Sequence, residues 1–146
     1  ATGESKESVA DHLELFAQAG FVAVAFDARY HGERALPHGG LEKGSLTLDA
    51  LGPDVVESLA EFRSQRLEVY HAALVRAWRQ GSGGERPFLF DSVSDAIAVV
   101  DDLEARPGVD ASRIGSTGVS LGGMHTWLLA AADERIAAAA PAIGVQ

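Results

Sequence analysis

The 146-residue sequence contains no cysteine, and basic residues are scarce in it. Without cysteine there can be no disulfide framework, no thiolate metal site and no cysteine nucleophile. Only 12 Lys and Arg residues stand against 21 Asp and Glu residues, which gives a formal net charge of -9. A chain of this charge is repelled by nucleic-acid phosphates and by anionic membranes, so neither is expected as a partner.

Long apolar stretches and metal-binding motifs are missing as well. No uncharged apolar stretch reaches the roughly 20 residues that a membrane span requires, so no span is expected. The residues from Ala1 to Lys6 lack the features of a signal peptide. They leave the compartment undetermined, with the cytoplasm slightly favoured, and say nothing of residues before them. His12, His38 and His71 lack metal-ligand spacing, so neither a metal nor another cofactor is expected.

The first 34 residues predict a helix followed by a strand. Ser8 and Asp11 have the spacing of a capping box, apolar residues follow at helical intervals, and Gly20 is placed to end the helix. Residues 21–26 form a continuous apolar run without polar alternation. Such a run is typical of a strand in a parallel sheet that is covered on both faces.

The last 60 residues predict a second alternation of helices and strands. Asp91 or Ser92 can cap a helix that Pro107 and Gly108 end. Three further elements are expected beyond it: a strand over 114–117, a helix over 120–132 and a strand over 136–140. This order of elements predicts an α/β fold with a parallel sheet flanked by helices.

The pattern Gly118-Val119-Ser120-Leu121-Gly122 lies between the second predicted strand and the helix after it. In that context G-x-S-x-G indicates a nucleophilic serine on a sharp turn, where flanking glycines allow the strand and helix to approach closely. The serine is also at a helix N-terminus, where unpaired N–H groups stabilise negative charge. We therefore predict Ser120 as the nucleophile, Gly118 and Gly122 as the glycines of its turn, and the Leu121 N–H as an oxyanion donor.

The same glycines have two other interpretations. Residues 118–123 have the glycine spacing of a phosphate-binding loop, but Met124 and His125 follow where that loop requires Lys and Ser or Thr. A glycine-rich turn without chemistry is the other alternative. The strand-to-helix context favours the nucleophile over both.

The motifs resemble those of the α/β-hydrolase superfamily. Asp27-Ala-Arg29-Tyr-His31-Gly32 follows an apolar strand, and Ser112-Arg-Ile-Gly115 leads into the serine turn. The closest similarity is to dienelactone-hydrolase-like esterases and prolyl-oligopeptidase-like acyl hydrolases. It covers residues 1–34 and 88–146. Residues 35–87 are interpreted as a helical insertion in a partial α/β-hydrolase domain that spans 1–146.

The resemblance implies a three-layer α/β/α fold in which 21–26, 114–117 and 136–140 are strands four, five and six. It also implies that this chain lacks strand three, which would lie between strands four and five. Thr2 or a neighbour would follow strand three and supply a second oxyanion donor. The triad acid and the catalytic histidine would lie beyond Gln146.

None of the histidines in the chain is a convincing base for Ser120. His125 is five residues past the serine, about 140° round the helix, and is interpreted as a packing or surface residue. His31 could approach the site from its loop, but the resemblance implies a structural role. Asp27 and Arg29 are expected to lock that loop, through an ion pair or through backbone hydrogen bonds.

Two functional hypotheses follow from these residues. The first is a serine hydrolase that cleaves ester-like bonds of a small-molecule substrate through an acyl-enzyme, with this chain inactive by itself. The second is a truncated or non-catalytic interaction protein that keeps the serine turn only as architecture.

Overall fold

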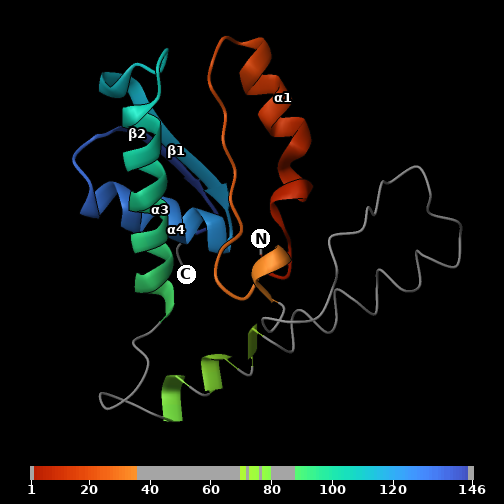
Figure 1. Cartoon of the computed structure of the whole chain (residues 1–146). Helices are drawn as coiled ribbons and strands as arrows, with labels where there is room; N and C mark the ends of the chain where they lie inside the picture. The colour runs from red at the N-terminus through yellow and green to blue at the C-terminus, as the bar shows by residue number, and fades with distance from the viewer. Residues whose placement is uncertain (1, 36–69, 72, 76, 80–87, 145–146) are drawn as a thin grey trace, which may run out of the picture.

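The computed structural model describes residues 2–35, 70–71, 73–75, 77–79 and 88–144. The predicted insertion at 35–87 therefore lies largely outside the described residues; the residues described between 70 and 79 are helical. No helix in the described ranges is long and apolar enough to cross a membrane. Figure 1 shows the arrangement of the other elements: a helix and an extended segment at the N-terminus, then two helices packed with a small sheet.

The sheet of the described residues consists of two parallel strands, β1 (Ile114–Val119) and β2 (Ile136–Ala142), joined through helix α4 (Leu121–Ala132). Its register pairs Gly115 with Ala138 and Val119 with Ala142, and an irregularity follows Ile114. Both strands and the helix were expected from the sequence. Helix α4 is the crossover that two parallel strands require. Because it follows β1 directly, its N-terminus lies at the edge of the sheet where both strands have their carboxyl ends.

Helix α3 (Phe88–Ala105) packs against α4 and covers the sheet beside it. It begins at Phe88, earlier than the caps expected at Asp91 or Ser92, because the apolar residues 88–90 form its first turn. After its last residue Gly108 adopts a φ of 88°, as expected of a residue that stops a helix. The described residues thus have the predicted α/β fold, a parallel sheet flanked by helices.

A small apolar core joins these elements. Ala96 and Val100 of α3 contact Ile114 of β1 and Leu129 of α4, and all four side chains are less than 8% exposed. Three partly buried residues pack around them: Ile97, Leu103 and Ile136. At the amino end of the sheet, Arg135 pairs with Asp101 and Glu104 of α3 and with Asp133. This network ties α3 to the turn that enters β2.

The N-terminal part has a 3-10 turn, η1 (Lys6–Val9), then helix α1 (Ala10–Gln18). The capping box expected at Ser8 is not formed, because Ser8 lies inside the 3-10 turn and its hydroxyl bonds the Ser5 carbonyl at 2.6 Å. Gly20 ends the helical region with a φ of 89°, as predicted. The Phe21 N–H then donates to the Phe16 carbonyl, and the chain turns back along α1 (Figure 1).

The strand predicted over 21–26 is not formed. These residues are extended, but no neighbouring strand among the described residues supplies the ladder of hydrogen bonds that defines a strand. Nor are they covered on both faces, since Phe21 is 61% exposed and Val22 60%. The apolar run correctly indicates an extended backbone but not its pairing.

Candidate active site

Ser120 forms the junction between β1 and α4, and its backbone is in a left-handed region with φ 56° and ψ -118°. Residues other than glycine rarely adopt such a conformation, and it persists only where the surrounding structure imposes it. Here the Ser120 N–H donates to the Ala142 carbonyl of β2 at 2.8 Å. The Ser120 carbonyl in turn accepts the Met124 N–H at 3.0 Å, which begins the helix.

The glycines around Ser120 differ in what they do. A Cβ on Gly118 would lie 2.5 Å from the backbone of Gly122, so Gly118 has to be glycine, as expected. A Cβ on Gly122 would meet no atom within 4 Å, which corrects the expectation that this position also needs a glycine to avoid a clash. A second close approach involves Gly123, whose Cβ would lie 2.6 Å from the Ala142 carbonyl.

Of the two predicted oxyanion donors, the structure places one beside the serine. Leu121 is the first residue of α4 and is 8% exposed, and N–H groups at that position have no partner within a helix. Thr2 lies in an exposed turn at the other end of the described chain. No hydrogen bond between described residues joins Thr2 to the Ser120 turn.

The loop after the extended segment is organised by the carboxylate of Asp27, which is 6% exposed. It accepts the backbone N–H of Lys6 at 2.7 Å and of Glu33 at 3.1 Å, and the Lys6 ammonium group lies 3.1 Å away. A Cβ on Gly32, which has a φ of 52°, would collide with this carboxylate. Burial alone would lower the pKa of Lys6, but the bond and charge of Asp27 outweigh it and raise that pKa.

Arg29 points from the same loop to α3 rather than to Asp27. Its guanidinium group binds both carboxylate oxygens of Asp95, at 3.0 and 3.2 Å, and Arg34 reaches Asp95 at 2.8 Å. Burial would raise the pKa of Asp95, but the hydrogen bonds from Arg29 and Arg34 outweigh it and lower that pKa. The loop was expected to be locked by an ion pair between Asp27 and Arg29 or by backbone hydrogen bonds. The structure has the backbone hydrogen bonds, which Asp27 accepts.

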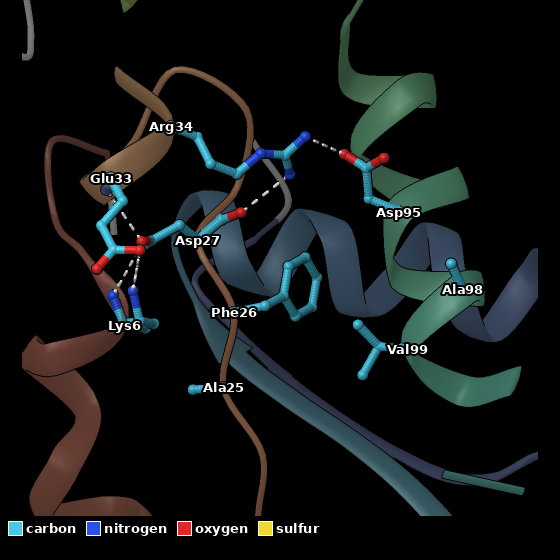
Figure 2. A pocket seen from close by; sticks show the side chains of 9 residues that line it. All are labelled: Lys6, Ala25, Phe26, Asp27, Glu33, Arg34, Asp95, Ala98 and Val99. Carbon is cyan, nitrogen blue, oxygen red and sulfur yellow. Dashed lines mark hydrogen bonds and ion pairs between the residues drawn. The ribbon is translucent and has the colours of Figure 1, made fainter. Parts of the chain in front are cut away.

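An open hollow of about 420 Å³ lies between this loop and α3. Figure 2 shows that Lys6, Asp27 and Glu33 gather on one side of it, whereas the Phe26 ring points toward Val99 of α3. Its charged side chains already bind one another. The hollow therefore resembles a packing gap with a paired polar rim more than a built ligand site.

The described histidines do not bind the Ser120 hydroxyl. His31 is 3% exposed, its Nδ1 lies 2.8 Å from the Arg29 carbonyl, and its ring contacts Tyr70 edge to face at 5.0 Å. This agrees with a structural role. Burial, together with the nearby charge of His31, lowers the pKa of His125 to about 4, so His125 is neutral at pH 7. His12 and His71 are exposed, and His38 lies outside the described residues.

Among the described residues no group of three or more His, Cys, Asp or Glu side chains could hold a metal ion. Sequence reasoning also missed two residues that contact the serine turn: Ala142, the last residue of β2, and Gly144, two residues after it. The glycine at 144 was the one visible signal, because a close backbone approach favours that residue.

The model of the dienelactone hydrolase family matches residues 1–146. A stretch of 44 residues is 39% identical to the "Putative hydrolase YtaP" of Bacillus subtilis (strain 168). That match covers 30% of this chain and 15% of the Bacillus protein, so the chain corresponds to a small part of that relative's length. No solved structure matches the chain significantly.

Proposed function

Because the chain belongs to the dienelactone hydrolase family, we propose that it carries the nucleophile of a serine hydrolase that cleaves ester-like bonds of small molecules. The single observation that carries this proposal is the left-handed backbone of Ser120 at the junction of β1 and α4. A polar residue held in a costly conformation at a helix N-terminus indicates a functional constraint, because an ordinary connection would avoid that cost.

In the proposed reaction the Ser120 Oγ attacks the carbonyl carbon of the substrate while a base removes the hydroxyl proton. Negative charge develops on the carbonyl oxygen, where the Leu121 N–H would stabilise it by about 3 kcal/mol. The ester C–O bond then breaks, the alcohol leaves with the proton, and the acyl group remains on Ser120. Water completes the cycle by hydrolysing this acyl-enzyme.

We further propose that the base and its acidic partner come from outside residues 1–146. His31 is engaged with the Arg29 carbonyl and the Tyr70 ring, and His125 forms no hydrogen bond with the serine. Without a base, a serine hydroxyl is a weak nucleophile. The 146 residues alone are therefore expected to be inactive, and Thr2 or a neighbour remains our candidate for the second oxyanion donor.

A fluorophosphonate probe tests this function, because it reacts covalently with activated serines. We expect the full-length protein to be labelled at Ser120, as located by mass spectrometry of the labelled peptide. Ser120→Ala should abolish labelling, whereas Ser94→Ala, at an exposed serine of α3, should not change it. Residues 1–146 alone should react about a hundredfold more slowly or not at all, since a general base contributes on that order.

An unlabelled full-length protein, correctly folded by circular dichroism, would contradict the enzyme. It would favour the alternative, a non-catalytic interaction protein that keeps the serine turn as architecture. Labelling of residues 1–146 at the rate of the full-length protein would instead contradict the external base.

A further inference from the structure

The end of β2 contacts the serine turn at two points. The Ala142 carbonyl accepts the N–H of Ser120 at 2.8 Å. Two residues later Gly144, which is buried, lies against Gly123 in the first turn of α4. The first contact involves Ala142, a member of the last pair of the sheet register, and the second lies beyond that pair.

The second contact joins backbone to backbone. A Cβ on Gly144 would collide with the carbonyl carbon of Gly123 and lie 2.5 Å from the nitrogen of Met124. From the other side, a Cβ on Gly123 would lie 3.0 Å from the Cα of Gly144. No side-chain rotation can make room for either substitution, so an added methyl group has to displace the first turn of α4 or the end of β2.

The path between the two contacts is strained. Ile143 has a φ of 56°, which a β-branched residue rarely adopts, and its side chain is 83% exposed. Burial of the Ile143 side chain therefore does not compensate for this conformation. The conformation follows from the two neighbours of Ile143, since Ala142 is bonded to Ser120 and Gly144 lies against Gly123.

We infer that Gly144 is a positioning residue for the nucleophile: its contact with Gly123 sets the position of Ser120 and of the Leu121 N–H relative to the substrate carbonyl. This inference rests on the proposed function. It assigns to Gly144 no contact with substrate and no part in proton transfer. A misplacement of about 1 Å at a reacting group can cost about a hundredfold in rate, so a small displacement here has a measurable effect.

The test measures fluorophosphonate labelling of the full-length protein as two constants, KI for reversible binding and kinact for the covalent step. Gly144→Ala should lower kinact about tenfold or more and leave KI within about twofold. The control is Gly108→Ala, at a glycine with a φ of 88° in the turn after α3, which is also destabilising. It should lower the melting temperature without changing kinact.

A milder pair of variants decides the matter if Gly144→Ala does not fold. Ala142→Gly adds no atom and removes an exposed methyl group, but it gives the backbone freedom at the carbonyl that holds Ser120. We expect kinact to fall about threefold. Ala139→Gly, the same change at an exposed position of β2 farther from the serine, should leave kinact unchanged.

The possible results separate the inference from the proposed function. If the unmodified protein is labelled at Ser120 and both Gly144→Ala and Ala142→Gly keep its kinact, the positioning role is wrong while the hydrolase stands. An equal loss of kinact in Gly108→Ala also overturns it, because the effect would then be one of general stability. If the unmodified protein is not labelled, both the function and the inference fail.

Discussion

The two halves of the described structure are held together by different forces. The β1–α4–β2 unit has a buried apolar core around Ile114 and Leu129, and parallel strands that pair along their length. The N-terminal part, residues 2–35, has exposed apolar side chains such as Phe21 and is held by hydrogen bonds around Asp27.

This difference shows where the site obtains its rigidity. In the β1–α4–β2 unit, apolar packing and close backbone contacts position Ser120, so its strained conformation can be maintained. In the N-terminal part, directional polar bonds to Asp27 fix one loop, and the segment before that loop is extended but unpaired. Substitutions in the first region should therefore act through packing, and those in the second through hydrogen bonds.

The largest expected effect is the loss of core packing. Leu129→Ala should lower the free energy of unfolding of the full-length protein by about 3 kcal/mol, because it removes a 6% exposed side chain and leaves a cavity. The measurement is urea unfolding followed by circular dichroism. Val22→Ala, at a residue that is 60% exposed, should change the value by less than about 0.5 kcal/mol. Equal losses would show that the two regions are packed alike.

A smaller loss is expected from the polar loop. The Asp27 carboxylate is a buried acceptor of two backbone N–H groups. In Asp27→Asn the NH2 group of the amide replaces one carboxylate oxygen, so one of these backbone N–H groups faces a donor and loses its hydrogen bond. The cost should be about 2 kcal/mol in the same unfolding measurement. Asp102→Asn is the matched control, because Asp102 also forms an ion pair, with Arg106, but both of these side chains are 58% exposed. Its effect should stay below about 0.5 kcal/mol.

The pH dependence of stability tests the burial of His125. Its pKa is about 4 in the folded protein, against 6.5 for an ordinary histidine, so the unfolded chain binds more protons between these values. The contribution to stability is complete above pH 6.5 and is lost as the pH falls toward 4. It amounts to about 2 kcal/mol, after a discount for partial exposure.

Unfolding at several pH values measures this contribution. His125→Gln should flatten the dependence between pH 4 and 6.5, whereas His12→Gln, at an exposed residue of α1, should not. An unchanged slope in His125→Gln would show that this ring is not buried in the folded protein.

The smallest expected effect is a gain. Ile143→Asn should raise the stability by about 1 kcal/mol, because asparagine tolerates the φ of 56° better than a β-branched residue does. Since the Ile143 side chain is 83% exposed, the change costs little apolar burial. Differential scanning calorimetry measures it. Val22→Asn, at an exposed residue without a positive φ, is the control and should give no gain.

Sequence reasoning predicted the elements whose residues specify them locally. Strands 114–117 and 136–140, the helix after Ser120 and the stop at Gly108 are all encoded by short apolar runs and by glycine. The sharp turn at Ser120 was expected from the same local pattern. These elements depend on neighbours within a few residues, which is the range that a sequence pattern describes.

Features that depend on distant partners were missed or wrong. Residues 21–26 were predicted as a strand because composition reveals an extended backbone but not whether another strand lies beside it. The close contact of Gly123 was missed, since its partner Gly144 is 21 residues further along the chain. The bond from Arg29 to Asp95 spans 66 residues and has no local signature.

The contact between Asp27 and Gly32 has a consequence for how this loop can evolve. Any side chain at position 32 would occupy the space of the Asp27 carboxylate, so position 32 cannot change while that acid is retained. Loss of Asp27 would remove this collision and leave only the φ of 52° to favour a glycine there. Among family members, an aspartate at position 27 should therefore occur together with a glycine at position 32.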